Sequence, residues 1–123
     1  MFYKIFFISL LLVCVTAAGV EEPPFKLSSK HKTWIEEEVL YVTLEQEREI
    51  FLSLQTEKER NQFIKAFWRK RDANRITPTN EFKEEHYRRI NYANSNFGRD
   101  TFREGWRTDR GRFYIKLGDP QHV

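Results

Sequence analysis

The stretch Gly105-Trp106-Arg107-Thr108-Asp109-Arg110-Gly111-Arg112 decides how the end of the chain is expected to fold. Gly105 permits a backbone turn that a side chain would obstruct, and Trp106 can anchor that turn in a hydrophobic core. Thr108 and Asp109 can bond to backbone amides of the turn, and Asp109 is expected to be ionised and paired with a neighbouring arginine. We therefore predict a structural or binding motif, most simply a locked loop that aims the segment after it. Its members are Gly105, Trp106, Thr108, Asp109, Arg110 and Gly111.

The segment that follows, residues 111–117, alternates apolar Phe113, Ile115 and Leu117 with Tyr114 and Lys116. This period of two predicts a half-buried β-strand, closed by a turn over residues 118–120. A single strand leaves its backbone donors and acceptors unpaired. We therefore expect residues 111–117 to be the first strand of an antiparallel sheet whose other strands come from a partner or have been lost by C-terminal truncation.

Helix-start signals recur through residues 29–97 and predict about four helices. Ser28 or Ser29 can cap the first, and Thr43 and Thr56 each stand three residues before a glutamine or glutamate, as in a capping box. Pro78 suits the first turn of the last and longest helix. The predicted fold is therefore α+β. The expected core residues are Trp34, Phe51, Phe63, Phe67, Trp68, Phe82, Ile90 and Phe97.

Acid–base side chains offer an alternative interpretation, a secreted or periplasmic hydrolase. The candidates are Asp72, Glu81, Glu85, His86 and Asp109. His86 lies on the apolar stripe of the last predicted helix, a position more typical of a packed core histidine than of a base or ligand. Because the sequence lacks a nucleotide-binding glycine loop, a zinc-protease signature and a hydrolase serine elbow, we predict no catalytic residue, no cofactor and no metal site.

The first nineteen residues have the pattern of a secretory signal peptide: Lys4, an apolar run from Ile5 to Val15, and then small residues. The run is about eleven residues long, whereas a membrane-spanning helix needs about twenty. Cys14 is the only cysteine and offers a second possibility, lipid attachment, although Val13 is a poor residue before that cleavage site. We predict a signal peptide over 1–19, a linker over 20–27 and one domain over 28–123.

Charge divides the rest of the chain into two parts. Residues 21–56 contain four Lys or Arg and eight Asp or Glu, whereas residues 57–123 contain sixteen and ten. A basic half rich in aromatic residues is compatible with nucleic-acid binding. The export signal and the interleaved Glu and Arg of residues 83–89 favour solvated ion pairs instead, so we expect no nucleic acid.

The motif of residues 105–109 resembles that of bacterial proteins with the GWxTD domain, which is named for the residues found here as Gly105, Trp106, Thr108 and Asp109. The likeness covers about residues 34–123, including segments 67–72, 80–94 and 118–120. In the family, the turn found here at Gly118 to Pro120 is followed by further strands rich in aromatic residues. The resemblance therefore also implies that this chain is truncated at its C-terminal end.

The resemblance implies an exported protein, periplasmic, outer-membrane associated or extracellular, with no established activity. We expect a non-catalytic interaction or assembly module of the envelope. Its partner would be another envelope protein or the missing strands of its own domain, and it would contact the membrane only through the signal peptide or a lipid on Cys14.

The export prediction is tested by mass spectrometry of the protein recovered from cells that naturally produce it. Cleavage of the predicted signal peptide gives an N-terminus near Ala18 to Val20, whereas lipidation gives an N-terminal, acylated Cys14. An intact Met1 on the soluble protein would contradict both.

Overall fold

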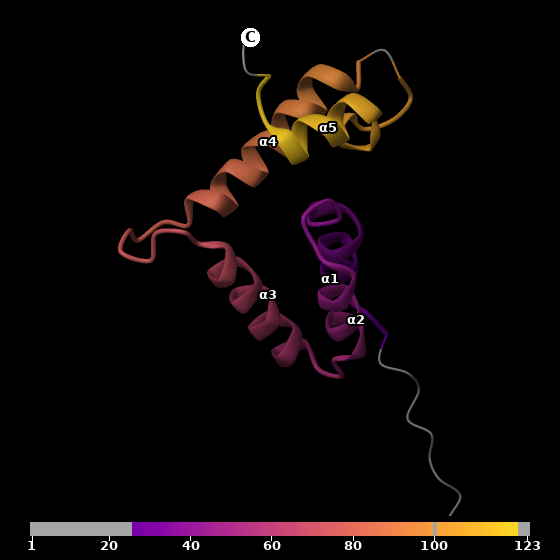
Figure 1. Ribbon diagram of the computed structural model, residues 1–123. Helices are drawn as coiled ribbons and strands as arrows, with labels where there is room; N and C mark the ends of the chain where they lie inside the picture. The colour runs from indigo at the N-terminus through magenta and orange to yellow at the C-terminus, as the bar shows by residue number, and fades with distance from the viewer. Residues whose placement is uncertain (1–25, 100, 121–123) are drawn as a thin grey trace, which may run out of the picture.

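The computed structural model describes residues 26–99 and 101–120, and the regular structure in these ranges is helical (Figure 1). Residues 1–25, with the predicted signal peptide and Cys14, lie outside the described residues. No helix of the described ranges is long and apolar enough to cross a bilayer. In chain order the elements are α1 (Ser29–Thr33), the π-helical turn η1 (Trp34–Glu38), α2 (Glu45–Ser53), α3 (Glu57–Arg71), α4 (Glu81–Phe97), the 3-10 turn η2 (Gly105–Arg107) and α5 (Asp109–Leu117).

Side-chain caps explain where most of these helices begin. The Thr56 hydroxyl accepts the Glu59 amide at 3.2 Å while the Glu59 carboxylate accepts the Thr56 amide at 2.9 Å, which is the predicted capping box of α3. The start of α2 differs from the prediction by one residue. The Thr43 hydroxyl donates back to the Val39 carbonyl at 2.8 Å, so the N-cap position falls to Leu44, whose amide donates to the Glu47 carboxylate at 3.1 Å.

The predicted strand over 111–117 is wrong, and with it the α+β fold class, because these residues form α5. The Thr108 hydroxyl caps this helix by accepting the Gly111 amide at 3.0 Å. The buried positions Gly111, Tyr114 and Ile115 follow helical spacing, while Phe113 is 57% and Leu117 76% exposed. A helix pairs its own backbone groups, so this segment needs no partner strands and the argument from an unpaired strand no longer holds.

Residues of η1, α2 and α3 form the first hydrophobic cluster, with Tyr87 of α4 packed against it. Trp34 lies at its centre, with its ring 5.1 Å from those of Phe51 and Phe67. Trp34, Phe51, Phe67 and Trp68 are 0–5% exposed, as expected of core residues, whereas Phe82 is 39% exposed at the cluster's edge. Tertiary burial of these aromatic rings supplies stability that such short helices lack alone.

A second cluster joins α4, η2 and α5, and Figure 1 shows α4 and α5 lying against one another. Its buried members are Ala93, Trp106 and Ile115. Tyr41, from the segment between η1 and α2, packs on this cluster and donates its hydroxyl to the Trp106 carbonyl at 3.0 Å. The segment between η1 and α2 therefore ties the second cluster to the first.

His86 of α4 is buried, at 4% exposure, among the rings of Trp68, Phe82 and Tyr87. Its Nε2 lies 2.6 Å from the Glu38 carbonyl, which can only accept, so Nε2 carries the proton. Burial lowers the His86 pKa below its usual 6.5, and the charges of Arg89 and Arg71 lower it further. The Glu38 carbonyl and carboxylate raise the pKa but do not offset this decrease. His86 is thus a neutral core histidine that links α4 to η1.

This burial predicts a pH-dependent stability. Because the folded-state pKa of His86 is lowered, the unfolded chain binds the extra proton, and stability present above about pH 6.5 is lost as the pH falls below that value. We expect the melting temperature to fall between about pH 7.5 and about pH 5.5. His86→Gln, which keeps an amide donor for Glu38 but does not titrate, should flatten this dependence. An equal fall in both proteins would assign it to other groups.

Candidate functional site

The two glycines of the 105–111 motif allow backbones to approach more closely than any side chain would permit. A Cβ on Gly105 would lie 1.8 Å from the Ala93 carbonyl oxygen of α4. A Cβ on Gly111 would lie 1.9 Å from the Gly105 carbonyl oxygen. These glycines therefore pack η2 directly on α4, and the first turn of α5 directly on η2.

Trp106 fixes this layered packing to two other parts of the chain. Its side chain is 8% exposed in the second cluster. Its amide donates to Asn94 Oδ1 on α4 at 2.9 Å, and its carbonyl accepts the Tyr41 hydroxyl. The indole Nε1–H donates to the Glu104 carboxylate at 3.1 Å, so the buried ring leaves no polar atom unpaired.

Thr108 and Asp109 have different roles. The Thr108 hydroxyl donates to the Gly105 carbonyl at 2.7 Å while it accepts the Gly111 amide, so one side chain closes η2 and opens α5. The Asp109 side chain is 89% exposed and pairs with Arg112 at 3.3 Å, one turn along α5. Of the two arginines that flank Asp109 in sequence, Arg107 and Arg110, Arg107 pairs with Glu104 at 3.0 Å and Glu37 at 3.4 Å. At the first position of α5, the Asp109 carboxylate still stabilises the helix through its interaction with the helix dipole.

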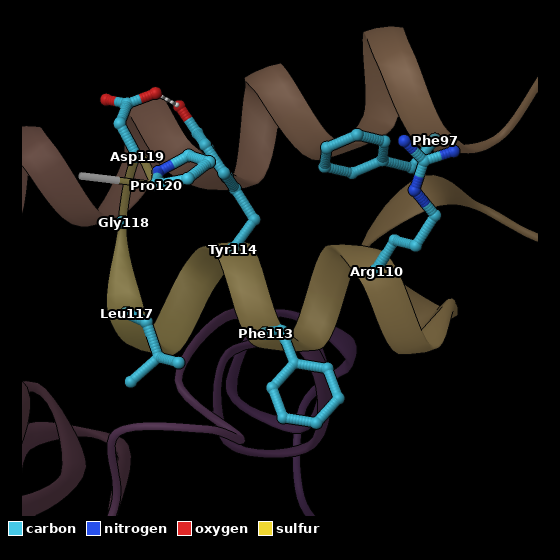
Figure 2. A pocket seen from close by; sticks show the side chains of 8 residues that line it. All are labelled: Phe97, Arg110, Phe113, Tyr114, Leu117, Gly118, Asp119 and Pro120. Atoms are coloured by element: carbon cyan, nitrogen blue, oxygen red, sulfur yellow. Dashed lines mark hydrogen bonds between the residues drawn. The ribbon is translucent and has the colours of Figure 1, made fainter. Parts of the chain in front are cut away.

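An open hollow of about 630 Å³ runs along the outer side of α5, and we call it the α5 groove. Its lining is Phe97, Arg110, Phe113, Tyr114, Leu117, Gly118, Asp119 and Pro120. Figure 2 shows Phe113 and Leu117 along one side, with Arg110 and Asp119 toward opposite ends. Positions 110, 113, 114 and 117 share one helical face, a signal that the strand interpretation of this segment concealed.

The two charged ends of the groove differ in how they are satisfied. The Arg110 guanidinium lies 5.0 Å from the Phe97 ring centroid and makes no ion pair within residues 26–99 and 101–120. Asp119 accepts the Tyr114 hydroxyl at 2.9 Å and Arg88 Nη2 at 3.3 Å. Burial raises the Tyr114 pKa above its usual 10, so this hydroxyl remains a proton donor to Asp119 at neutral pH.

The residues considered for a hydrolase have separate structural roles. Glu85 accepts hydrogen bonds from Arg88 and Arg89, which lower its pKa to about 2, so it carries no proton to donate near neutral pH. His86 has its Nε2 proton committed to Glu38, and Glu81 accepts the Thr77 hydroxyl at 2.7 Å. Glu85 and His86 border a pocket of only about 90 Å³, whose lining does not include the other three candidates, Asp72, Glu81 and Asp109.

The described residues contain no group of three or more His, Cys, Asp or Glu side chains arranged to hold a metal ion. Cys14 lies outside these ranges. No candidate acid pairs with His86, whose Nε2 bonds to the Glu38 carbonyl, and the adjacent Glu85 pairs with two arginines.

These features define a class: a small helical domain in which a glycine-tryptophan turn locks the last helix onto the preceding long one and leaves an apolar groove on its outer side. The model of the GWxTD domain matches residues 19–123, and the chain belongs to this family. No curated protein and no solved structure matches it in the corresponding comparisons.

Trp106→Ala tests the locking role of the motif. Truncating a buried indole costs about 3 kcal/mol, and here the second cluster loses the ring that packs against Tyr41. We expect the melting temperature to fall by roughly 10 °C or more for a domain of this size, measured by circular dichroism. Arg75→Ala, an exposed arginine in the loop before α4, is the control and should melt like the wild type. Equal melting of the two variants would contradict the anchor.

Proposed function

We propose that this GWxTD-domain chain is an exported, non-catalytic protein-interaction module of the bacterial cell envelope, and that it binds its partner in the α5 groove. The observation that carries the proposal is the exposure of Phe113 and Leu117, at 57% and 76%, beside a hollow of about 630 Å³. An apolar helix face next to a concavity is typical of surfaces that bind another protein.

The groove also indicates what kind of partner fits. Phe113, Leu117 and the half-buried Phe97 offer an apolar floor that gains free energy when covered. Arg110 at its edge makes no ion pair with a carboxylate of the described residues, so an acidic side chain of the partner could form one. The expected partner segment is therefore apolar and carries an acid opposite Arg110.

One sequence feature supports the compartment, and the ion pairs of the structure argue against nucleic acid. Residues 1–19 have the charge and length pattern of a cleaved signal peptide, with Cys14 as the alternative lipidation site. The positive charge of residues 57–123 is partly compensated by ion pairs, such as Arg71 with Glu47 at 2.6 Å and Arg89 with Glu85 at 2.7 Å. This compensation favours a protein partner over nucleic acid, which needs uncompensated cations.

A photo-crosslinking residue at Leu117 tests the groove in cells that naturally produce the protein. Ile76, 95% exposed in the loop between α3 and α4, is the matched control position. We expect a discrete adduct with one envelope protein from position 117 and none from position 76. Adding Arg110→Glu should abolish this adduct, and Arg110→Lys should retain it. The same adducts from both positions, or none from either, would contradict the proposal.

A further inference from the structure

The α5 groove has opposite charges at its two ends. Arg110 lies in the first turn of α5, and Asp119 follows the turn at Gly118 that ends the helix. Figure 2 shows the two toward opposite ends of α5 along one edge of the helix, with the exposed pair Phe113 and Leu117 along the other edge. The order along the groove is therefore cation, apolar pair, anion.

Such an order is complementary to itself when reversed. Resting on the function proposed above, we propose that the partner is a second copy of this chain, bound groove to groove with the two α5 helices antiparallel. In this pairing Arg110 of each copy faces Asp119 of the other, and Phe113 of each packs against Leu117 of the other. A two-fold axis near the middle of α5 generates all four contacts, as an isologous interface requires.

The lengths agree with this pairing. Residues 110 and 117 are seven apart in α5, which at 1.5 Å per residue separates their backbones by about 10 Å. Two antiparallel helices in contact place the start of one beside the end of the other, so each cation reaches the turn at residues 118–119 of its neighbour. The apolar side chains then meet at the centre, where water is excluded most completely.

Both charged groups have the capacity for the new contact. The Asp119 side chain is 69% exposed, and each oxygen accepts one hydrogen bond, from Tyr114 or Arg88. A carboxylate has about four acceptor positions, so Asp119 can also accept from a guanidinium. Arg110 is exposed, its guanidinium lies 5.0 Å from the Phe97 ring centroid, and within the described residues it makes no ion pair that would compete for its donors.

The size of the interface sets its strength. One face of a nine-residue helix offers less than the roughly 800 Å² per partner of a standard stable interface. We therefore expect a dimer that dissociates on dilution, with a dissociation constant on the order of micromolar, and whose association weakens as salt is added.

Sedimentation velocity of the full chain, recovered from producing cells, over a concentration series tests this arrangement. Arg110→Glu places two like-charge pairs in the dimer, and so does Asp119→Arg, so each should weaken dimerisation about tenfold or more. An equimolar mixture of the two variants restores opposite charges at both contacts and should recover the wild-type dimer. Arg103→Glu, an exposed arginine outside the groove, is the charge-matched control and should behave as wild type.

Circular dichroism of each variant establishes that it is folded, and the mixture distinguishes lost pairing from damage to either chain, because a damaged chain is not rescued by another. A wild type that stays monomeric, single variants that dimerise as well as wild type, or a mixture that stays monomeric would overturn the antiparallel pairing. If position 117 nevertheless forms an adduct with a different envelope protein, the proposed function stands and only the second copy is excluded.

Discussion

The contact on which the C-terminal half depends is the approach of the Gly105 backbone to the Ala93 carbonyl of α4, where a Cβ would lie at 1.8 Å. No side chain fits there, so η2 can lie directly on the long helix only if residue 105 is glycine. Gly111 makes the same kind of close backbone contact with Gly105, at the first turn of α5. Two successive close contacts thus determine the distance and angle at which α5 packs, and Trp106 between them fills the remaining space.

This packing decides which face of α5 is covered. With Gly111 against η2, Ile115 turns into the second cluster, and Phe113 and Leu117 are left outside. The apolar exposure of the groove is therefore a consequence of how the motif packs rather than an accident of a short helix. It also explains why the motif and the groove share Arg110: the residue lies two positions after the Thr108 cap, in the first turn of α5, and lines the groove.

The sequence permitted the α3 cap and the aromatic first cluster to be predicted because those signals are local. Thr56 and Glu59 define their helix start by themselves, and Trp34 and Phe67 are large apolar residues on helical faces. The segment after Thr108 is ambiguous, because Phe113, Ile115 and Leu117 satisfy a period of two, whereas Tyr114 beside them also allows helical spacing. The groove is lined by one face of a helix, so it cannot be predicted from a segment interpreted as a strand.

Local chemistry around residues 108–118 nonetheless contained the signals that decide between the two structures. Thr108 followed by Asp109 is a helix start, with a hydroxyl cap and an acid in the first turn. Gly118, at φ 81°, is a helix stop of the kind that only glycine adopts without strain, and its amide closes the last turn on the Tyr114 carbonyl at 2.8 Å. In the sequence, Thr108 and Asp109 are expected to bond within the turn of the 105–111 motif, and Gly118 is expected in the turn that closes a strand. In the structure Thr108 serves both, since its hydroxyl donates to the turn and accepts from the helix. A motif that predicts a locked loop in sequence is therefore also a helix cap, and Thr108 joins the turn that packs on α4 to the helix that lines the groove.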